Sequence, residues 1–393
     1  MAFSDQSEKR KAVNEVDFSE VVEVIKNDNI VQLLIWLDDG SIPNVDVRSG
    51  PDFEYSSLLI MASKLGKINA VRLLLKYGAS INRANGVLNT PIDVACHAGH
   101  LDIVILLHNR GADVDNPGIL RLTCRNDHVE IVRYLLDHGT DISRNLRAYG
   151  KALVAACKSG HLKVAQLLVE RGAYVNYLGD DYEDEEDRNP LTAACYGNHF
   201  EVAKYLVSIG ADPLVAAPLA SLCDENVELI NYLLENGADI DAFDRESNPL
   251  LRASEFGLVE NVKALLERGA DVHIRNTVQW NATPLIRASM MLYNAEYVPT
   301  IKLLLDYGAD TNDVDANGDS ALIRLLKTST RFTEGDLECV RLLLQYGADV
   351  TLTNLAGQTA SSLVEAGSAI CNLLEEYRDQ NDRELLAVRP LVK

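Results

Sequence analysis

The chain has 393 residues, of which 47% are hydrophobic, and a formal net charge of −21 at pH 7. This charge disfavours a nucleic-acid-binding surface, which needs a basic stripe, and favours either a basic partner or simply solubility. No apolar run approaches the eighteen or so residues of a membrane span, and the N-terminal sequence MAFSDQSEKRK lacks the apolar core of a signal peptide. We therefore expect an intracellular protein without a membrane span, cytoplasmic in the first place and with a nuclear location left open.

The beginning of the chain predicts a polar segment followed by two helices. Residues 1–14 are polar, and we expect them to be frayed. From Phe18 to Asp39 apolar residues recur at helical spacing, and Glu20 and Glu23 are placed to face outward from the end of an array. This part of the sequence therefore predicts the opening pair of a helical stack.

The stretch from Thr90 to Gly111 shows the unit of that stack most clearly. Thr90 can cap a first helix through its hydroxyl, and Pro91 suits the first helical position, where no N–H partner is needed. Gly99 ends the first apolar run, and Gly111 ends a second one in the left-handed conformation. Because two such short helices cannot bury their apolar faces alone, they need neighbours of the same kind.

The closing glycine recurs along almost the whole chain. It stands at Gly40, Gly78, Gly111, Gly139, Gly172, Gly210, Gly237, Gly269, Gly308 and Gly347. The opening phrase returns as NPLTAA from Asn189, NPLLRA from Asn248 and TPLIRA from Thr283. A period near 33 residues, with two helices per unit and G-A-D after the second, resembles the ankyrin repeat family.

The resemblance implies an all-α ankyrin-repeat solenoid of about eleven helix-turn-helix repeats, counting both caps, with finger loops between them. We number the repeats by their closing glycines, so that Gly40 ends the first and Gly347 the tenth. The expected organisation is a flexible segment at 1–14, a repeat domain at 15–377 and a C-terminal tail at 378–393. A solenoid of this kind is one quasi-linear unit.

Two repeats are short, and one has a long connector. The fourth and seventh repeats, which end at Gly139 and Gly237, lack five or six residues. We predict truncated fingers there, with both helices of each repeat retained. In the sixth repeat the connector carries an acidic loop at residues 180–187, acidic at seven of its eight positions.

The sequence favours no catalytic or metal site and no cofactor. His100, His128 and His161 stand at the start of second helices, where a turn hydrogen bond is their expected role. Cys96 and Cys124 occupy one repeat position, at which a small apolar residue packs between helices. No HExxH, paired CxxC, P-loop, GxGxxG or GxSxG motif occurs, so we predict that the chain is not an enzyme.

The acidic loop has a structural and a functional interpretation. As a solvated loop it would contribute only solubility. Alternatively, it is a docking arm for a lysine- or arginine-rich partner segment, with Tyr182 as its anchor and acids such as Asp184 and Glu185 as its charges.

One column of the repeat changes character toward the C-terminus. The residue before the alanine of the first helix is Met61, Val94, Leu122, Ala155, Ala193 and Ala220, and then Arg252, Arg287 and Arg324. Each arginine can pair with a local carboxylate such as Asp244, Glu246 or Glu255. Alternatively, the three form a ladder that binds an extended acidic or phosphorylated segment.

Large side chains gather in the same region. Phe243 and Trp280 stand in finger connectors, whereas Phe256 and Met291 end first helices. Aromatic side chains and arginine are typical of binding hot spots, although Trp280 could instead fold over its own hairpin. These four residues complete the predicted partner-binding set.

The resemblance implies a non-catalytic scaffold or adaptor that binds a partner protein or an extended peptide along its concave finger and first-helix surface. The alternative is a regulatory or targeting subunit of an enzyme assembly, of the ubiquitin-ligase adaptor or pathogen effector type.

Overall fold

The structure is a computed structural model, and it describes a defined part of the chain. The described residues are 16–42, 44–46, 56–87, 89–114, 117–138, 146–179, 189–215, 218–222, 224–244, 247–276, 280–290, 297–328 and 332–388, with side chains up to residue 379. Among them the regular elements are helices, together with isolated β-bridges that join Asn276 to Ala282 and Val314 to Ser320. The predicted all-α fold is therefore confirmed.

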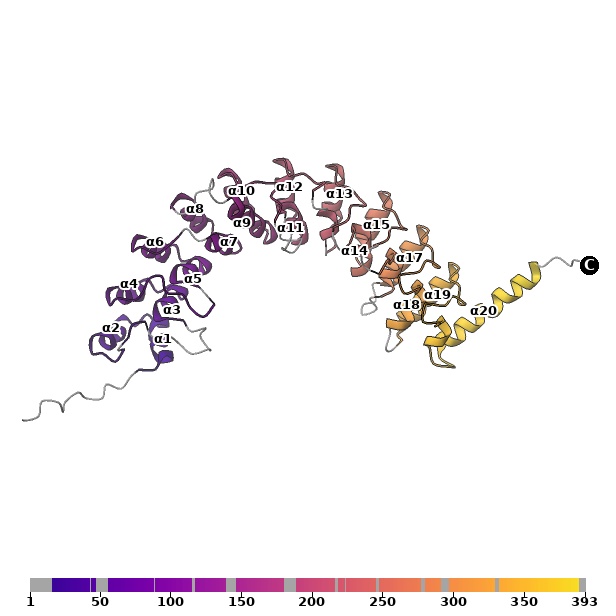
Figure 1. The fold of residues 1–393 in the computed structure, drawn as a ribbon, viewed down its shortest axis with the longest axis horizontal. Helices are drawn as coiled ribbons and strands as arrows, with labels where there is room; N and C mark the ends of the chain where they lie inside the picture. Colours follow the sequence, from indigo (N-terminus) through magenta and orange to yellow (C-terminus); the bar gives the residue numbers. More distant parts are fainter. Residues whose placement is uncertain are drawn as a thin grey trace, which may run out of the picture. The chain divides into compact units, whose positions relative to one another are not determined.

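Contacts divide the chain into two compact units, Met1–Tyr174 and Val175–Lys393. The helices of the first unit are α1 (Phe18–Lys26), α2 (Ile30–Asp38), α3 (Leu58–Lys64), α4 (Ile68–Lys76), α5 (Pro91–Ala98), α6 (Leu101–Asn109), α7 (Pro117–Cys124), α8 (Val129–His138), α9 (Leu146–Lys158) and α10 (Leu162–Glu170). The first helices α1, α3, α5, α7 and α9 contact one another in chain order, and so do the second helices α2, α4, α6, α8 and α10. The unit therefore consists of two layers (Figure 1).

The second unit repeats this two-layer arrangement. Its elements are α11 (Pro190–Tyr196), α12 (Phe200–Ser208), η4 (Pro218–Ser221), α13 (Val227–Glu235), α14 (Pro249–Phe256), α15 (Val259–Glu267), α16 (Pro284–Ala288), α17 (Tyr297–Asp306), α18 (Ala321–Thr328), α19 (Glu334–Gln345), η5 (Ala360–Leu363) and α20 (Ala369–Val388). The first-helix layer runs through α11, η4, α14, α16, α18 and η5. The second-helix layer runs through α12, α13, α15, α17, α19 and α20.

The predicted capping of the first helices is present. The Thr90 hydroxyl accepts the Asp93 N–H, and the Asp93 carboxylate accepts the Thr90 N–H at 2.7 Å, which completes a capping box at α5. Pro91 follows at the first helical position, and Gly99 ends the helix at a φ of 83°. Asn248 and Thr283 also cap α14 and α16 by accepting a backbone N–H with their side chains, without the second bond of a capping box, and each is followed by proline.

The turn histidines bind the preceding repeat. The Nε2 atom of His100 lies 3.2 Å from the Lys64 carbonyl, that of His128 lies 3.0 Å from the His97 carbonyl, and that of His161 lies 2.9 Å from the Arg125 carbonyl. Because a carbonyl only accepts hydrogen bonds, each Nε2 carries the proton and donates. The structural interpretation of these histidines is confirmed.

The cysteines are packing residues, as the sequence predicts. Cys96, Cys124, Cys157, Cys195, Cys339 and Cys371 are all buried and free. Burial raises the pKa of the Cys96 thiol to about 12, and it raises the pKa of Cys124 further still. Thiols of this kind are protonated and unreactive at neutral pH.

The structure corrects the expectation that both short repeats keep two full helices. In the seventh repeat the first helix is only the four-residue 3-10 helix η4, because the next helix cap, Asn226, comes eight positions after Pro218. In the fourth repeat His128 comes eleven positions after Pro117. The deletion therefore shortens the helix there, and not only the finger. At the C-terminus α20 continues from Ala369 to Val388, across residue 378, and the boundary between the repeat domain and the tail stays a prediction.

Candidate protein-binding site

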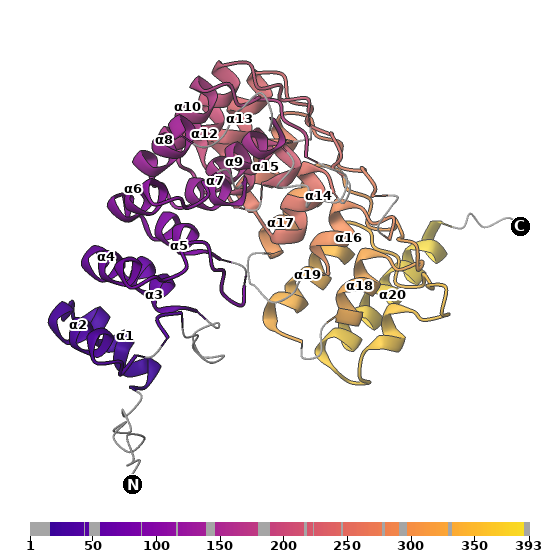
Figure 2. The ribbon, with the colours of Figure 1, turned by 60° about the vertical axis from the view of Figure 1, so that its left-hand side comes forward.

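The three arginines of the repeat column lie on α14, α16 and α18. These helices follow one another in the first-helix layer of the second unit (Figure 2). The arginine side chains are largely buried, with 19% of Arg252, 5% of Arg287 and 13% of Arg324 exposed. A buried guanidinium group is costly unless it is paired and hydrogen-bonded, so the partners of these arginines determine what the column can do.

Each arginine forms an ion pair with a nearby carboxylate. Arg252 donates to Asp244 at 3.1 Å, and Arg287 donates to Glu255 at 3.3 Å. The Nε atom of Arg324 lies 2.6 Å from a carboxylate oxygen of Asp315. Pairing of each arginine with a local carboxylate is the first of the two interpretations that the sequence offered for this column.

The fingers supply two of these carboxylates. Asp244 and Asp315 follow their closing glycines by the same number of residues. In each finger one carboxylate oxygen accepts backbone N–H groups, from Ser247 at 2.6 Å and from Asn317 at 2.8 Å, and the other oxygen binds the arginine. In each finger the aspartate side chain thus closes the finger turn and neutralises the charge of the arginine on the first helix.

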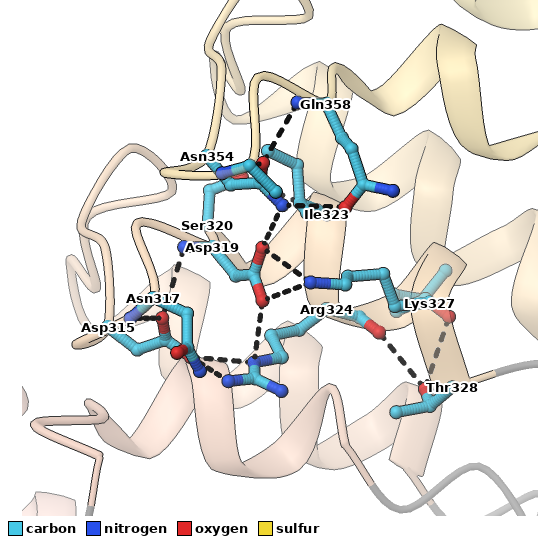
Figure 3. A network of polar contacts seen from close by, with 12 residues as sticks. Asp315, Asn317, Asp319, Ser320, Ile323, Arg324, Lys327, Thr328, Asn354 and Gln358 are labelled. Carbon is cyan, nitrogen blue, oxygen red and sulfur yellow. Dashed lines mark hydrogen bonds and ion pairs between the residues drawn. The ribbon is translucent and has the colours of Figure 1, made fainter.

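In the tenth repeat the pair grows into a closed network (Figure 3). The Asp319 carboxylate accepts Lys327 Nζ at 2.9 Å and lies 3.3 Å from Arg324 Nε. Asn354, in the finger of the eleventh repeat, donates to the same carboxylate at 2.7 Å. Two buried acids, Asp315 and Asp319, therefore face two bases, so that the network carries no net charge.

The pairing bears on the predicted ligand of the ladder. To bind an acidic or phosphorylated segment, the arginines would have to give up part of these internal contacts. Arg287 is the most enclosed of the three, although it stands in the middle of the column. The sequence analysis did not find Asp319. Its role as a shared acceptor depends on Arg324 and Lys327 of the first helix and on Asn354 of the next finger, which come together only in the folded chain.

Trp280 lies at the surface above this column. Its side chain is 53% exposed, and its indole ring centre is 5.9 Å from the Arg287 guanidinium carbon and 5.6 Å from that of Arg324. Both distances are within the range of cation–π attraction. Trp280 thus does more than fold over its own hairpin, since it contacts arginines of two repeats.

Neighbouring fingers are joined by backbone hydrogen bonds. The Ala316 N–H donates to the Trp280 carbonyl at 2.7 Å, and the Leu355 N–H donates to the Asn317 carbonyl at 3.0 Å. Arg275 adds a bond from Nη1 to the Val314 carbonyl at 2.9 Å. The fingers of repeats nine to eleven therefore form one connected ribbon.

This ribbon and the neighbouring eighth finger expose a set of large apolar side chains, which we call the finger surface: Phe243, Trp280, Val314 and Leu355. Leu355 is the most exposed of them, at 82%. Phe256, also exposed, ends α14 nearby in the chain. The sequence prediction included Phe243, Phe256 and Trp280, but it missed Val314 and Leu355. The repeat pattern contains no signal that these two side chains are exposed.

Some predicted site residues lie outside the described residues. These are Tyr182, Asp184 and Glu185 of the acidic loop, together with Met291. Within the described part of the chain, no group of three or more His, Cys, Asp or Glu side chains is placed to hold a metal ion. No helix among the described residues has the length and apolar character needed to cross a bilayer.

Two-helix repeats that contact one another in chain order within each unit place the chain among the helical repeat proteins. A family model described as ankyrin repeats (3 copies) matches residues 20–118, 115–179 and 250–354, and a second, described as ankyrin repeats (many copies), matches 153–207. The chain belongs to the ankyrin repeat family. Ankyrin repeats are protein-interaction modules and are in general not catalytic.

Several curated proteins are similar to the chain over part of their length. The Caenorhabditis elegans ankyrin repeat and KH domain-containing protein mask-1 is 30% identical over 230 residues, which are 56% of this chain and 7% of that protein. The probable E3 ubiquitin-protein ligase XBOS33 of Oryza sativa is 26% identical over 47% of this chain and 39% of its own length. The putative ankyrin repeat protein R598 of Acanthamoeba polyphaga mimivirus is 30% identical over 42% of this chain and 58% of its own length. The chain thus spans less than two thirds of each of these relatives.

Proposed function

We propose that this chain is a non-catalytic scaffold or adaptor that binds a partner protein or an extended peptide through the finger surface and the adjoining first helices of repeats eight to eleven. The observation that carries the proposal is Trp280, which combines exposure, a left-handed backbone and contact with two buried arginines. Buried free thiols in both units support a reducing compartment, which favours the cytoplasm or the nucleus.

The backbone at Trp280 argues against a purely structural role. Trp280 and Asn281 have φ values of 57° and 51°, a region that glycine occupies freely and that costs another residue about 1–2 kcal/mol. An exposed tryptophan adds little to the solenoid core, so stability alone would favour glycine at this position. Strained conformations of this kind occur at binding sites, where the side chain repays the cost.

The arginines contribute by holding the indole. Arg287 and Arg324 are fixed by their carboxylates, and both guanidinium groups lie within cation–π distance of Trp280. The ring is therefore positioned before a partner arrives, which lowers the entropy cost of binding. An apolar or aromatic partner side chain would find a rigid anchor there.

The charged partner segments named from the sequence stay predictions. A basic segment could dock on the acidic loop at 180–187, and an acidic or phosphorylated segment could engage Arg252 and Arg324 at their exposed edges. A targeting subunit of an enzyme assembly is a second candidate function, favoured by the similarity to a probable E3 ubiquitin-protein ligase. It would use the same surface to select its target.

A capture experiment tests the proposal. The wild-type chain, Trp280→Ala and Val87→Ala are immobilised at equal density, and the proteins that they retain from a cell extract are quantified by mass spectrometry. Val87 is a matched control, because it is an exposed apolar finger residue of the first unit. The partner should be lost with Trp280→Ala and kept with Val87→Ala. A partner retained equally by all three proteins would place the site elsewhere.

Fluorescence then locates the contact. The chain has two tryptophans, so Trp36→Phe leaves Trp280 as the only one. Titration with the captured partner should shift the emission of this variant, because a half-exposed indole becomes buried. The enzyme-assembly candidate predicts in addition that ubiquitin-ligase components are captured with the partner.

A further inference from the structure

Between its terminal elements, the first-helix layer of the second unit is thinnest at repeat seven. There it consists of the four-residue 3-10 helix η4, which lies between α11 with seven residues and α14 with eight. η4 buries Leu219 and Ala220. A single 3-10 turn has poorer hydrogen-bond geometry than an α-helix, and it offers less surface to its neighbours. The first helices of repeats six and eight are therefore connected through a short and weakly held element.

The finger of repeat seven also lacks a bond that fingers of other repeats have. Asn82, Asn176 and Asn312 each donate to the carbonyl of the glycine that closes their own repeat, and each accepts an N–H two residues further on, at the start of the next repeat. We call this pair of bonds the clamp. In repeat seven the clamp position holds Leu214, whose side chain is 64% exposed and can neither donate nor accept. Leu214 therefore cannot clamp the seventh finger to the eighth.

The second-helix layer of the same repeats is, by contrast, tied together by asparagines. Asn226, which caps α13, donates from its side-chain amide to the Asn198 side chain at 2.5 Å. The Asn226 backbone N–H donates to the Asn261 side chain at 2.9 Å, and the Asn261 amide donates to the Asp224 carbonyl at 2.9 Å. Repeats six, seven and eight are thus joined near the beginnings of α12, α13 and α15.

Further contacts strengthen this side of repeat seven. The ring of Tyr232 on α13 packs edge-on against Phe200 on α12, with 5.6 Å between the ring centres, and its hydroxyl donates to the Lys204 carbonyl at 3.4 Å. Toward repeat eight, the Glu260 N–H donates to the Glu225 carboxylate at 3.2 Å. The two layers of repeat seven are therefore held very unequally.

We propose that repeat seven is a hinge within the second unit, with Asn198, Asn226 and Asn261 as its pivot. Bending that opens the finger side keeps the asparagine bonds and costs only contacts of η4. Short elements absorb such rotations, whereas packed helices shift little. The hinge changes the spacing between the fingers of repeats six and eight, and a partner protein that contacts both fingers selects one spacing.

Distance measurements by electron paramagnetic resonance test the hinge. Spin labels are attached through noncanonical amino acids, so that the buried cysteines stay intact. The pair Leu178 and Phe243 spans repeat seven, and the matched pair Phe243 and Val314 spans repeat nine, all at exposed finger positions. The distance distribution across repeat seven should be at least about twofold broader than that across repeat nine. Repeat nine is a suitable control, because Arg275 and backbone bonds join its finger to the tenth.

A restored clamp makes the test decisive. Leu214→Asn introduces the clamp residue of repeats three, six and ten, and it should narrow the distribution between Leu178 and Phe243 to the width measured across repeat nine. Leu355→Asn makes the same chemical change at an exposed position of the eleventh finger, and it should leave both widths unchanged. Melting temperatures verify that both variants fold. Equal widths across repeats seven and nine in the wild type, or a width across repeat seven that Leu214→Asn does not reduce, would overturn the proposal.

Discussion

Arg287 donates to Glu255 of the preceding repeat, at 3.3 Å, because its own finger lacks the carboxylate that its neighbours have. Asp244 and Asp315 bind the arginines of repeats eight and ten, but the equivalent residue of repeat nine is Asn276. Because Asn276 stands where the neighbouring repeats have aspartate, Arg287 binds a carboxylate of the preceding repeat and not one of its own finger. In a stack whose stability is a sum of repeat and interface contributions, such a bond strengthens the interface.

The first prediction concerns this pair. Arg287→Ala should lower the free energy of unfolding by about 1–3 kcal/mol, since it leaves Glu255 without its partner and opens space under Trp280. Urea unfolding followed by circular dichroism measures the change. Arg341→Ala is the control, because Arg341 pairs with Glu338 at 3.6 Å with both side chains about half exposed, and it should cost less than about 0.5 kcal/mol. Equal losses of unfolding free energy in the two variants would mean that the buried pair contributes no more than an exposed one.

The second prediction concerns the left-handed backbone at Trp280. Alanine at this position keeps the strain of a φ of 57°, whereas glycine removes it. Trp280→Gly should therefore be more stable than Trp280→Ala by about 1 kcal/mol, although both lose the contacts with the arginines. Urea unfolding of the two variants provides the comparison. If alanine were the more stable residue, the turn would not be strained and the argument for a binding role would lose its basis.

The third prediction rests on a recurring clamp between repeats. Asn82, Asn176 and Asn312 each donate to the carbonyl of the glycine that closes their own repeat, and each accepts an N–H two residues further on, at the start of the next repeat. Asp241 stands at the same position and accepts the Asp271 N–H at 3.1 Å. A carboxylate cannot donate the second bond, so this clamp is incomplete.

Burial raises the pKa of Asp241, and the carboxylates of Asp271 and Asp239 add to this effect against the lowering by the Asp271 N–H. Because the folded pKa lies above the unfolded one, the folded state binds more protons, and stability falls as the pH rises from the unfolded pKa through the folded one. Asp241→Asn should remove this loss and complete the clamp. We expect a gain of about 1 kcal/mol at pH 7 that shrinks toward pH 3, as measured by urea unfolding at both values. A variant less stable than the wild type at pH 7 would contradict this account.

The fourth prediction concerns the core of the third repeat. Leu106 is buried on α6, and Leu106→Ala should cost about 2–5 kcal/mol. Because each repeat contacts its neighbours, hydrogen exchange should increase in α4 to α8 before it increases in α1. Leu214→Ala, at an exposed position, is the control and should change the stability little. Equal loss of protection throughout the first unit would exclude a one-dimensional stack there.

The fifth prediction concerns the thiols. Burial raises the pKa of Cys96 and Cys339 to about 12, and the pKa values of Cys157 and Cys195 are raised as well. These cysteines should react with a thiol reagent at pH 8 only as fast as the protein opens, and urea should accelerate the reaction. Mass spectrometry assigns the label to individual cysteines. Rapid labelling of Cys96 in the native protein would show that its packing is loose.

Sequence alone was sufficient for the repeat architecture. The signals are local: Thr90 and Pro91 begin a helix, Gly99 and Gly111 end helices, and their recurrence specifies the stack. The register of Arg252, Arg287 and Arg324 could also be predicted, because equal repeat positions lie on neighbouring first helices. What the periodicity could not show was the length of a helix after a deletion, as in η4, because a lost turn and a lost finger shorten the repeat equally.

The tertiary structure decided which groups meet. The pairing of Arg287 with Glu255, the position of Trp280 over two arginines and the burial of Asp319 each join residues that come together only when finger and helix pack against the next repeat. The repeat pattern is set by backbone propensity within about ten residues, whereas these contacts depend on side-chain length and on atoms that lie one repeat apart.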